Sequence, residues 1–180
     1  MIKLLIQIFL FVNFTLLAQE CFDKTKDVRN ILRSNKIMTY NAKVIGGCIK
    51  NNILHVTLKV DGQYTLALTG MGFTVRQAGL AQTLEPFFES VRDVFKKFPE
   101  INSYLIYYVD FEKITDKYGN LVENKKIIYM TLGMSRETAN KVNWNYIQDN
   151  LKSAILYKEQ DFDKIMGMLD IMKINNEYNH

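Results

Sequence analysis

Residue types that carry catalysis and metal binding are scarce in this sequence. Its 180 residues include only two histidines and two cysteines, and one of the histidines, His180, is the last residue. Protein metal sites usually gather three or four such ligands, so no metal site is predicted. Gly70-Met71-Gly72 lacks the third glycine of a dinucleotide-binding turn and the lysine of a phosphate-binding loop. The sequence therefore predicts no bound cofactor.

Long runs of like charge are missing as well. The chain has 23 Lys and Arg against 19 Asp and Glu, a net charge of +4, and no run of five basic residues. Nucleic-acid binding usually shows as a clustered basic patch, so a nucleic-acid partner has little support. Asp110, Glu112 and Asp116 are interleaved with lysines, which indicates a solvated hairpin tip rather than a calcium site.

The one long apolar stretch lies at the N-terminus. Lys3 is the only charged residue before Ala18, and most residues between them are apolar. A short positive start, a brief apolar segment and a small residue before a polar one are typical of a secretory signal peptide. The sequence thus predicts a signal peptide over 1–18 and a single mature domain over 19–180. That domain is expected to be periplasmic or extracellular, without a membrane span. An uncleaved anchor and a lipid-modified Cys21 are the alternatives.

The two cysteines, Cys21 and Cys48, are both in the predicted mature chain. In an exported protein an even count favours a disulfide. This one would tie the mature N-terminus to the sheet, and closing the loop is worth about 3 kcal/mol on the loop-entropy model. The alternative is a pair of buried thiols.

Hydrophobic periodicity predicts alternating strands and helices. Residues 53–60 alternate apolar and polar residues as a half-buried strand does, and residues 74–98 repeat apolar residues at helical spacing. Pro86 lies inside that helix and is expected to kink or divide it. The other predicted elements are a helix over 22–36, a strand over 38–49 with a turn at Asn51-Asn52, a short strand over 64–70, strands over 103–114 and 125–134, and helices over 145–157 and 160–172.

Together these elements predict an α+β fold. The strand 53–60, the long helix and the strand 103–114 form a β-α-β unit with parallel strands, and 125–134 adds an antiparallel strand. The predicted architecture is a small mixed sheet containing this β-α-β-β unit, with the long helix on one face and the C-terminal helices on the other. Folding the hairpin about Tyr118-Gly119 pairs Tyr107 with Met130 and Tyr108 with Tyr129, although a slip of one residue would exchange the faces.

That register gives the sheet one apolar face and one rich in tyrosine. The long helix is expected to cover Leu105, Tyr107 and Val109, together with Leu54, Val56 and Leu58. The second face carries the candidate binding residues His55, Tyr104, Tyr108, Asp110 and Tyr129. Either the C-terminal helices cover this face, or part of it is open to a partner, since tyrosine is favoured at interfaces.

No motif in the sequence specifies a reaction. The functional prediction is an exported, non-enzymatic binding protein whose partner is another envelope or secreted protein, with its oligomeric state left open. One alternative is an exported hydrolase that uses His55 and Asp110. The other is a carrier that holds a small apolar ligand between the long helix and the sheet.

Overall fold

The computed structural model describes residues 21–34, 43–59, 69–70, 72, 74–157 and 159–175. The predicted signal peptide over 1–18 lies outside these residues, and so does most of the predicted strand 64–70.

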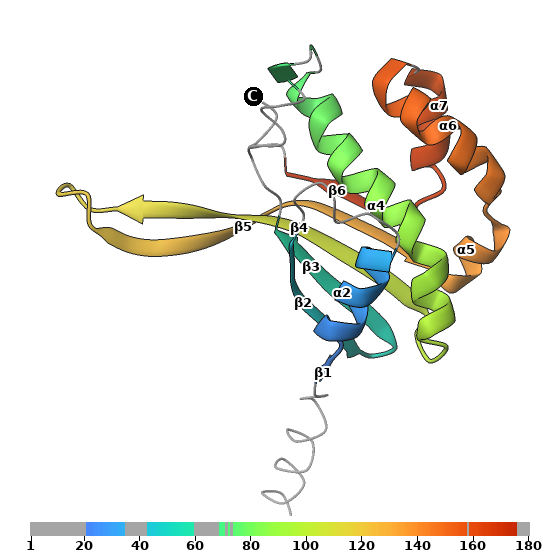
Figure 1. The fold of residues 1–180 in the computed structure, drawn as a ribbon, viewed down its shortest axis with the longest axis horizontal. Coiled ribbons are helices and arrows are strands. Elements are labelled where there is room, and N and C mark those ends of the chain that lie inside the picture. Colours follow the sequence, from blue (N-terminus) through green and yellow to red (C-terminus); the bar gives the residue numbers. More distant parts are fainter. Residues whose placement is uncertain are drawn as a thin grey trace, which may run out of the picture.

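The described chain forms one six-stranded mixed sheet and several helices (Figure 1). Neighbouring strands follow the chain order and are antiparallel, except that β3 and β4 are parallel. The α+β fold and its β-α-β-β unit are therefore confirmed. In chain order the elements are β1 (Phe22–Asp23), α2 (Thr25–Ser34), β2 (Lys43–Lys50), β3 (Ile53–Lys59), α4 (Val75–Lys97), β4 (Ser103–Thr115), β5 (Leu121–Ser135), α5 (Arg136–Lys141), α6 (Trp144–Tyr157), α7 (Glu159–Met166) and β6 (Ile171–Ile174).

Local sequence explains several of these boundaries. Asn51 and Asn52 both have positive φ, 51° and 57°, as a two-residue hairpin turn between twisted strands requires. Ser135 caps α5, because its hydroxyl accepts a hydrogen bond from the backbone N–H of Thr138. The turn and the helix cap thus follow from residue types, asparagine and serine, that favour these positions.

Helix α4 runs through Pro86 without dividing. A proline inside a helix removes one backbone donor and loosens the turn before it. Here the Tyr108 hydroxyl of β4 donates a hydrogen bond to the carbonyl of Thr83, which lies in that turn. A side chain of the sheet thus satisfies a carbonyl near the proline, and Pro86 itself is buried.

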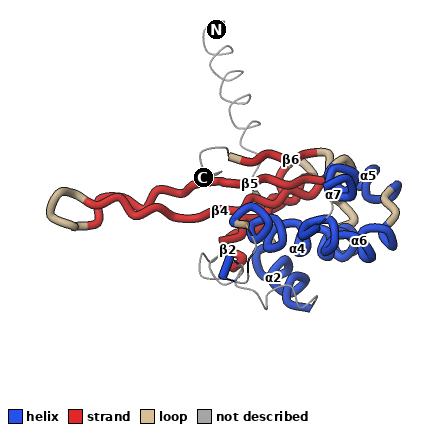
Figure 2. Tube along the Cα trace, turned by 90° about the horizontal axis from the view of Figure 1, so that it is seen from above, coloured by secondary structure: helices blue, strands red, loops and turns tan. Residues whose placement is uncertain are grey.

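All the described helices pack on one face of the sheet, as Figure 2 shows. Helix α4 is central and contacts both α2 and α6. The prediction that the C-terminal helices cover the opposite face is wrong. Ile147 and Leu151 of α6 join the same hydrophobic core as α4, so that face of the sheet and the helices share one core.

The last predicted helix is shorter than expected. Helix α7 ends at Met166, and residues Ile171–Ile174 pair with β5 as the edge strand β6. The backbone N–H groups of Met168 and Leu169 donate to the carbonyls three residues earlier, of Ile165 and Met166, so the end of the helix tightens. Asp170 then joins the end of β5, because its carboxylate accepts from the backbone of Ser135 and from the Thr138 hydroxyl.

The register of β4 and β5 changes twice along the hairpin, between Tyr108 and Val109 and, near the turn, between Ile114 and Thr115. Beyond the sheet, Val109 pairs with Ile128 and Glu112 with Lys125, which is the register predicted from the turn. A bulge between Tyr108 and Val109 then adds one residue to β5. Within the sheet Tyr108 therefore faces Met130, and the predicted pairing of Tyr108 with Tyr129 is wrong.

The parallel register of β3 and β4 decides which residues of β4 the helices cover, because Leu54 pairs with Tyr104 and Leu58 with Tyr108. Tyr104, Ile106 and Tyr108 are on the helix side and are fully buried. Leu105 and Tyr107 are on the other side and are half-buried. The predicted assignment of the two faces of β4 is thus inverted.

Candidate functional site

Two of the predicted binding residues, Tyr104 and Tyr108, are part of the hydrophobic core. The Tyr104 ring stacks on Phe87 of α4 at 5.5 Å, and its hydroxyl lies 3.1 Å from the Ser90 hydroxyl. Burial raises the pKa of both tyrosines above the ordinary value. Since neither side chain reaches the surface, these two residues hold α4 on the sheet and cannot contact a partner.

Tyr129 and Asp110 lie where the sheet meets the projecting part of the hairpin. The Tyr129 ring packs 6.4 Å from the Tyr108 ring, and its hydroxyl is buried without a hydrogen-bond partner in the described part of the chain. Burial first, and then the charge of Asp110, raise the pKa of Tyr129. Asp110 is exposed and accepts a hydrogen bond from the backbone of Phe111 at 2.8 Å.

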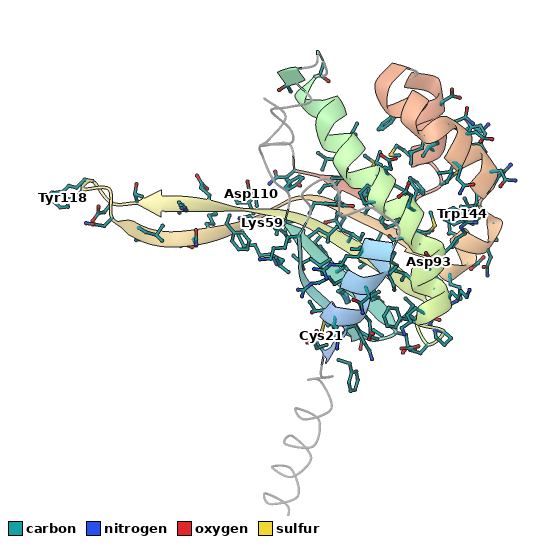
Figure 3. The ribbon with its side chains drawn as sticks, viewed as in Figure 1. Cys21, Lys59, Asp93, Asp110, Tyr118 and Trp144 are labelled. Carbon is teal, nitrogen blue, oxygen red and sulfur yellow. A yellow bond between two sulfur atoms is a disulfide. The ribbon has the colours of Figure 1, made fainter. Side chains whose placement is uncertain are left out.

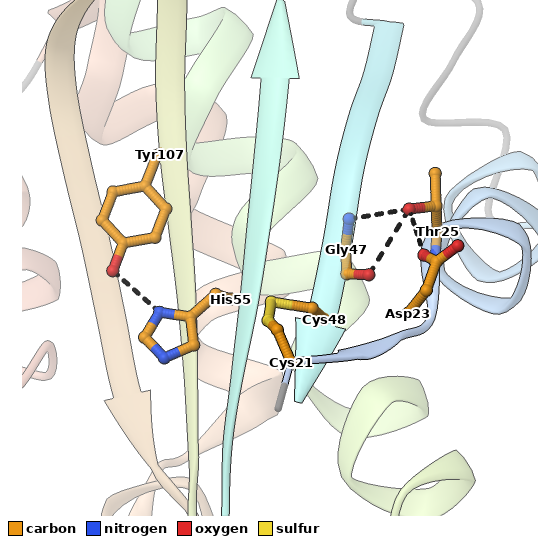
Figure 4. Close-up of a disulfide and its surroundings, with 7 residues drawn as sticks. All are labelled: Cys21, Asp23, Thr25, Gly47, Cys48, His55 and Tyr107. Carbon is orange, nitrogen blue, oxygen red and sulfur yellow. Dashed lines mark hydrogen bonds between the residues drawn. A yellow bond between two sulfur atoms is a disulfide. The ribbon is translucent and has the colours of Figure 1, made fainter. Parts of the chain in front are cut away.

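His55 lies on the other face of the sheet, which no described helix covers. We call this the helix-free face and define it by His55, Thr57, Leu105, Tyr107 and Thr131. The Nδ1 atom of His55 lies 2.9 Å from the Tyr107 hydroxyl, and the two rings are nearly parallel (Figure 4). Burial, and then the charge of Lys50, lower the pKa of His55.

The structure does not bring His55 and Asp110 together. His55 pairs with Leu105, and Asp110 is five residues further along β4 on the opposite face. At the rise of a β-strand this is a separation of about 17 Å. The predicted binding residues are therefore divided between the core, the helix-free face and the hairpin.

Cys21 and Cys48 lie at disulfide distance next to the helix-free face (Figure 4). Their Cα atoms are 5.5 Å apart, within the usual range for a disulfide. Thr25 reinforces this corner, since its hydroxyl accepts from the backbone N–H of Gly47 at 3.0 Å. The predicted pairing of the two cysteines is thus compatible with the fold.

A long two-stranded ribbon projects from the sheet (Figure 1). We call residues 110–128 the arm. Beyond Val109, β4 pairs only with β5 among the described strands, and β6 contacts β5 only over 130–133. The arm therefore has solvent on both faces and at both edges of the described structure.

The arm carries most of the large hydrophobic side chains that the described residues expose. Five of the eight lie in it. These five are Ile114, Tyr118, Leu121, Val122 and Ile128. Tyr118, at the far end, is 77% exposed (Figure 3). We call Ile114, Tyr118, Leu121 and Val122 the apolar tip.

Side-chain hydrogen bonds order the turn at the end of the arm. The Asp116 carboxylate accepts from the backbone of Tyr118 at 2.8 Å and of Asn120 at 2.9 Å. The hydrogen bond from the Asn120 side chain, and then these backbone hydrogen bonds, lower the pKa of Asp116. Gly119 supplies the positive φ of 84° that the turn requires. Tyr118 is thus presented by a defined turn.

The sequence predicts the hairpin tip but not the length of the arm. β4 has 13 residues and β5 has 15, whereas β3 has seven. A strand that is longer than its neighbour extends beyond the sheet unless another element pairs with the extra length. This difference in strand length was the signal from which the arm could have been predicted.

The described residues contain no group of three or more histidine, cysteine or carboxylate side chains arranged to hold a metal ion. None of the described helices is both long and apolar enough to cross a membrane. Comparison with protein-family models, with curated proteins and with solved structures finds no match for this chain.

Proposed function

We propose that this protein is an exported, non-enzymatic binding protein that contacts a macromolecular partner through the arm. The observation that carries the proposal is the apolar tip, which holds exposed side chains at the end of a ribbon far from the core. Exposed apolar groups that cluster on one element favour an interaction site. The export part of the proposal is supported by the Cys21–Cys48 pair, which suits an oxidising compartment.

The stability of the arm gives a second reason to expect a partner. An isolated two-stranded hairpin is only marginally stable in water. Here the turn hydrogen bonds of Asp116 stabilise one end and the sheet holds the other, while the middle is exposed on both faces. A bound partner would supply the missing packing.

Neither alternative function has a comparable observation behind it. A hydrolase that uses His55 and Asp110 would need them on one face, but they lie on opposite faces. A carrier would need space between α4 and the sheet, and there the rings of Phe87, Tyr104 and Tyr108 fill the interface. The binding function therefore has the strongest support.

The test compares the chain with a variant of the apolar tip. The mature chain, 19–180, is immobilised, and an extract of envelope and secreted proteins, supplemented with a tagged copy of the chain itself, is passed over it. We expect Tyr118→Ser combined with Leu121→Ser to lose whatever wild type retains. The matched control is Phe22→Ser, which removes a side chain 61% exposed in the body of the protein.

Equal capture by wild type and the tip variant would contradict the proposal. Circular dichroism of both variants checks folding. We expect both to stay folded, because surface substitutions outside caps and cores usually change the free energy of unfolding by less than about 0.5 kcal/mol.

A further inference from the structure

The outer edge of the arm on the β5 side exposes unpaired backbone groups. β6 reaches only Gly133 to Met130, so residues 121–128 have no strand beside them in the described structure apart from β4. An open strand edge is a template for pairing with another chain. The side chains along this edge decide which chain fits.

A strand that pairs with its own copy obeys a symmetry rule. In an antiparallel pair related by a two-fold axis, one residue faces itself at the axis, and residues equally far on either side face each other. Registers centred on Glu123, Lys125 or Lys126 would place identical charges opposite each other, which is destabilising. The register centred on Asn124 instead places Glu123 opposite Lys125 of the second copy, twice.

We propose that two copies of this protein associate through their arms, with the β5 strands paired antiparallel about a two-fold axis at Asn124. The inference rests on the proposed function and names its partner as a second copy of the chain. Glu123 and Lys125 are free for this role, since the described residues contain no salt bridge at either. Each Lys125 would then lie between Glu112 of its own hairpin and Glu123 of the second copy.

The β4 edge of the arm does not have this property. Symmetric registers centred on Asp110, Glu112 or Lys113 set that charged residue against its own copy. A register centred on Phe111 sets Asp110 against Glu112 of the second copy. Like charges therefore disfavour pairing through β4 in each of these registers. The β5 edge differs, because its register centred on Asn124 pairs opposite charges.

The proposed register also fits the length of the arm. It places Ile128 beside Asn120 of the second copy, so each tip ends near the base of the other arm, where β6 begins to pair at Met130. Both bodies then lie at opposite ends of a four-stranded ribbon. Four strands form a more stable unit than two, and Leu121 comes near Ile127 of the second copy.

A charge exchange tests the register. Sedimentation equilibrium is expected to show a dimer for wild type and, for Glu123→Lys or Lys125→Glu alone, a dissociation constant roughly tenfold higher, because two pairs become repulsive. The exchange variant carries both substitutions together with Glu112→Lys, which keeps an opposite charge across from residue 125 in its own hairpin. It restores the pairs between copies and is expected to recover the wild-type constant. A monomeric wild type, or a dimer that neither single variant weakens, would overturn the inference.

A cysteine on the axis provides a second readout. Asn124→Cys is expected to form an intermolecular disulfide under mild oxidation, because it faces its own copy. The control is Lys113→Cys, which lies directly opposite Asn124 in the same hairpin but on β4. In the proposed dimer the two copies of residue 113 are separated by three strand spacings, about 14 Å, and do not cross-link. Equal cross-linking at the two positions would refute the register.

The outcomes separate this inference from the proposed function. If wild type is monomeric but the apolar tip is needed to capture a different protein, pairing between copies is wrong and the binding function stands. If wild type is monomeric and the tip variant captures what wild type captures, both are wrong.

Discussion

The same two strands, β4 and β5, build two regions with opposite environments. In the body of the sheet, Tyr104, Ile106 and Tyr108 are fully buried beneath α4. In the arm, Ile114 is 37% exposed and Leu121 is 56% exposed. The difference is not one of strand chemistry, because both regions contain aromatic and β-branched residues. It comes from what lies beside the strands, since the helices reach only the body.

The sequence of an apolar strand does not by itself indicate which element, if any, packs against it. Tyr104 and Tyr108 were predicted on the face opposite the long helix, covered by the C-terminal helices or open to a partner, and both are in the core beneath that helix, whereas the apolar residues of the hairpin end are exposed. Burial depends on the neighbouring element. In this chain the helices cover the part of the hairpin that lies in the sheet, and no described helix covers the arm.

Hydrogen exchange would show the largest difference between the two regions. We expect backbone amides of the body, such as those of Ile106 and Leu132, to exchange only through global opening, which costs about 5–15 kcal/mol in typical domains. Amides of the arm, such as that of Lys113, should exchange through local opening near 0–1 kcal/mol. The measurement uses Glu123→Lys at low concentration, so that pairing between copies gives no protection and the Glu112–Lys125 pair within the arm is kept. Equal protection in both regions would contradict the comparison.

Truncating a tyrosine in each region gives the next largest effect. Tyr108→Ala removes a buried ring and its hydrogen bond to Thr83, and we expect the free energy of unfolding to fall by about 3–5 kcal/mol. Tyr118→Ala in the arm should change it by less than about 0.5 kcal/mol. Urea denaturation measures both. A small effect of Tyr108→Ala would mean that this residue is not in the core.

Adjacent glycines of β2 allow a finer test of the helix-covered face. A Cβ atom at Gly47 would lie 3.3 Å from backbone atoms of Thr25 and 3.2 Å from Val28, at the start of α2. Gly47→Ala is therefore expected to cost about 1–3 kcal/mol through overpacking. Gly46 is the control, because its added Cβ would meet only Thr57 at 3.9 Å, an ordinary contact. Equal costs for the two substitutions in thermal or urea unfolding would refute the close approach of α2 to β2.

The smallest expected effect concerns His55 on the helix-free face. Its pKa is lowered by burial, so the unfolded chain binds protons more readily than the folded protein. The free energy of unfolding therefore has its full value above pH 6.5, the ordinary pKa of histidine. It decreases as the pH drops from there through the lowered pKa. Because the side chain is partly exposed, we expect a loss of only a few tenths of a kcal/mol between pH 7.5 and 5.5. His55→Gln should abolish this part of the pH dependence in thermal unfolding, and an unchanged profile would show that His55 does not titrate in this range.

Several elements could be predicted from the sequence because their causes are local. The alternation of Leu54, Val56 and Leu58 sets a half-buried strand, and Asn51-Asn52 suits a tight hairpin turn. The parallel crossover from β3 to β4 follows from the intervening long helix. Each of these features depends on residues near one another in the chain.

The candidate site could not be predicted to the same degree. The prediction groups His55 with Tyr108 and Asp110 because it puts Leu54 on the same face as Leu105, whereas in the structure Leu54 pairs with Tyr104. The bulge in β5 separately removes Tyr129 from its predicted place opposite Tyr108, and no local pattern predicts either the β3–β4 register or the bulge. The arm was recognised only as a hairpin tip, because its length depends on where the neighbouring strands end.

By itself, the sequence determined the order and type of most elements, the pairing partners of the two hairpins and the pair of cysteines. Periodicity and turn chemistry act over a few residues, so they can be read along the chain. Only the tertiary structure decided that all described helices share one face, that residues after Gly167 form β6 rather than more helix, and that the register of β3 against β4 puts Tyr108 on the helix-covered face. Those outcomes depend on which distant surfaces bury each other and on where the neighbouring strands end, and neither can be read from a few residues along the chain.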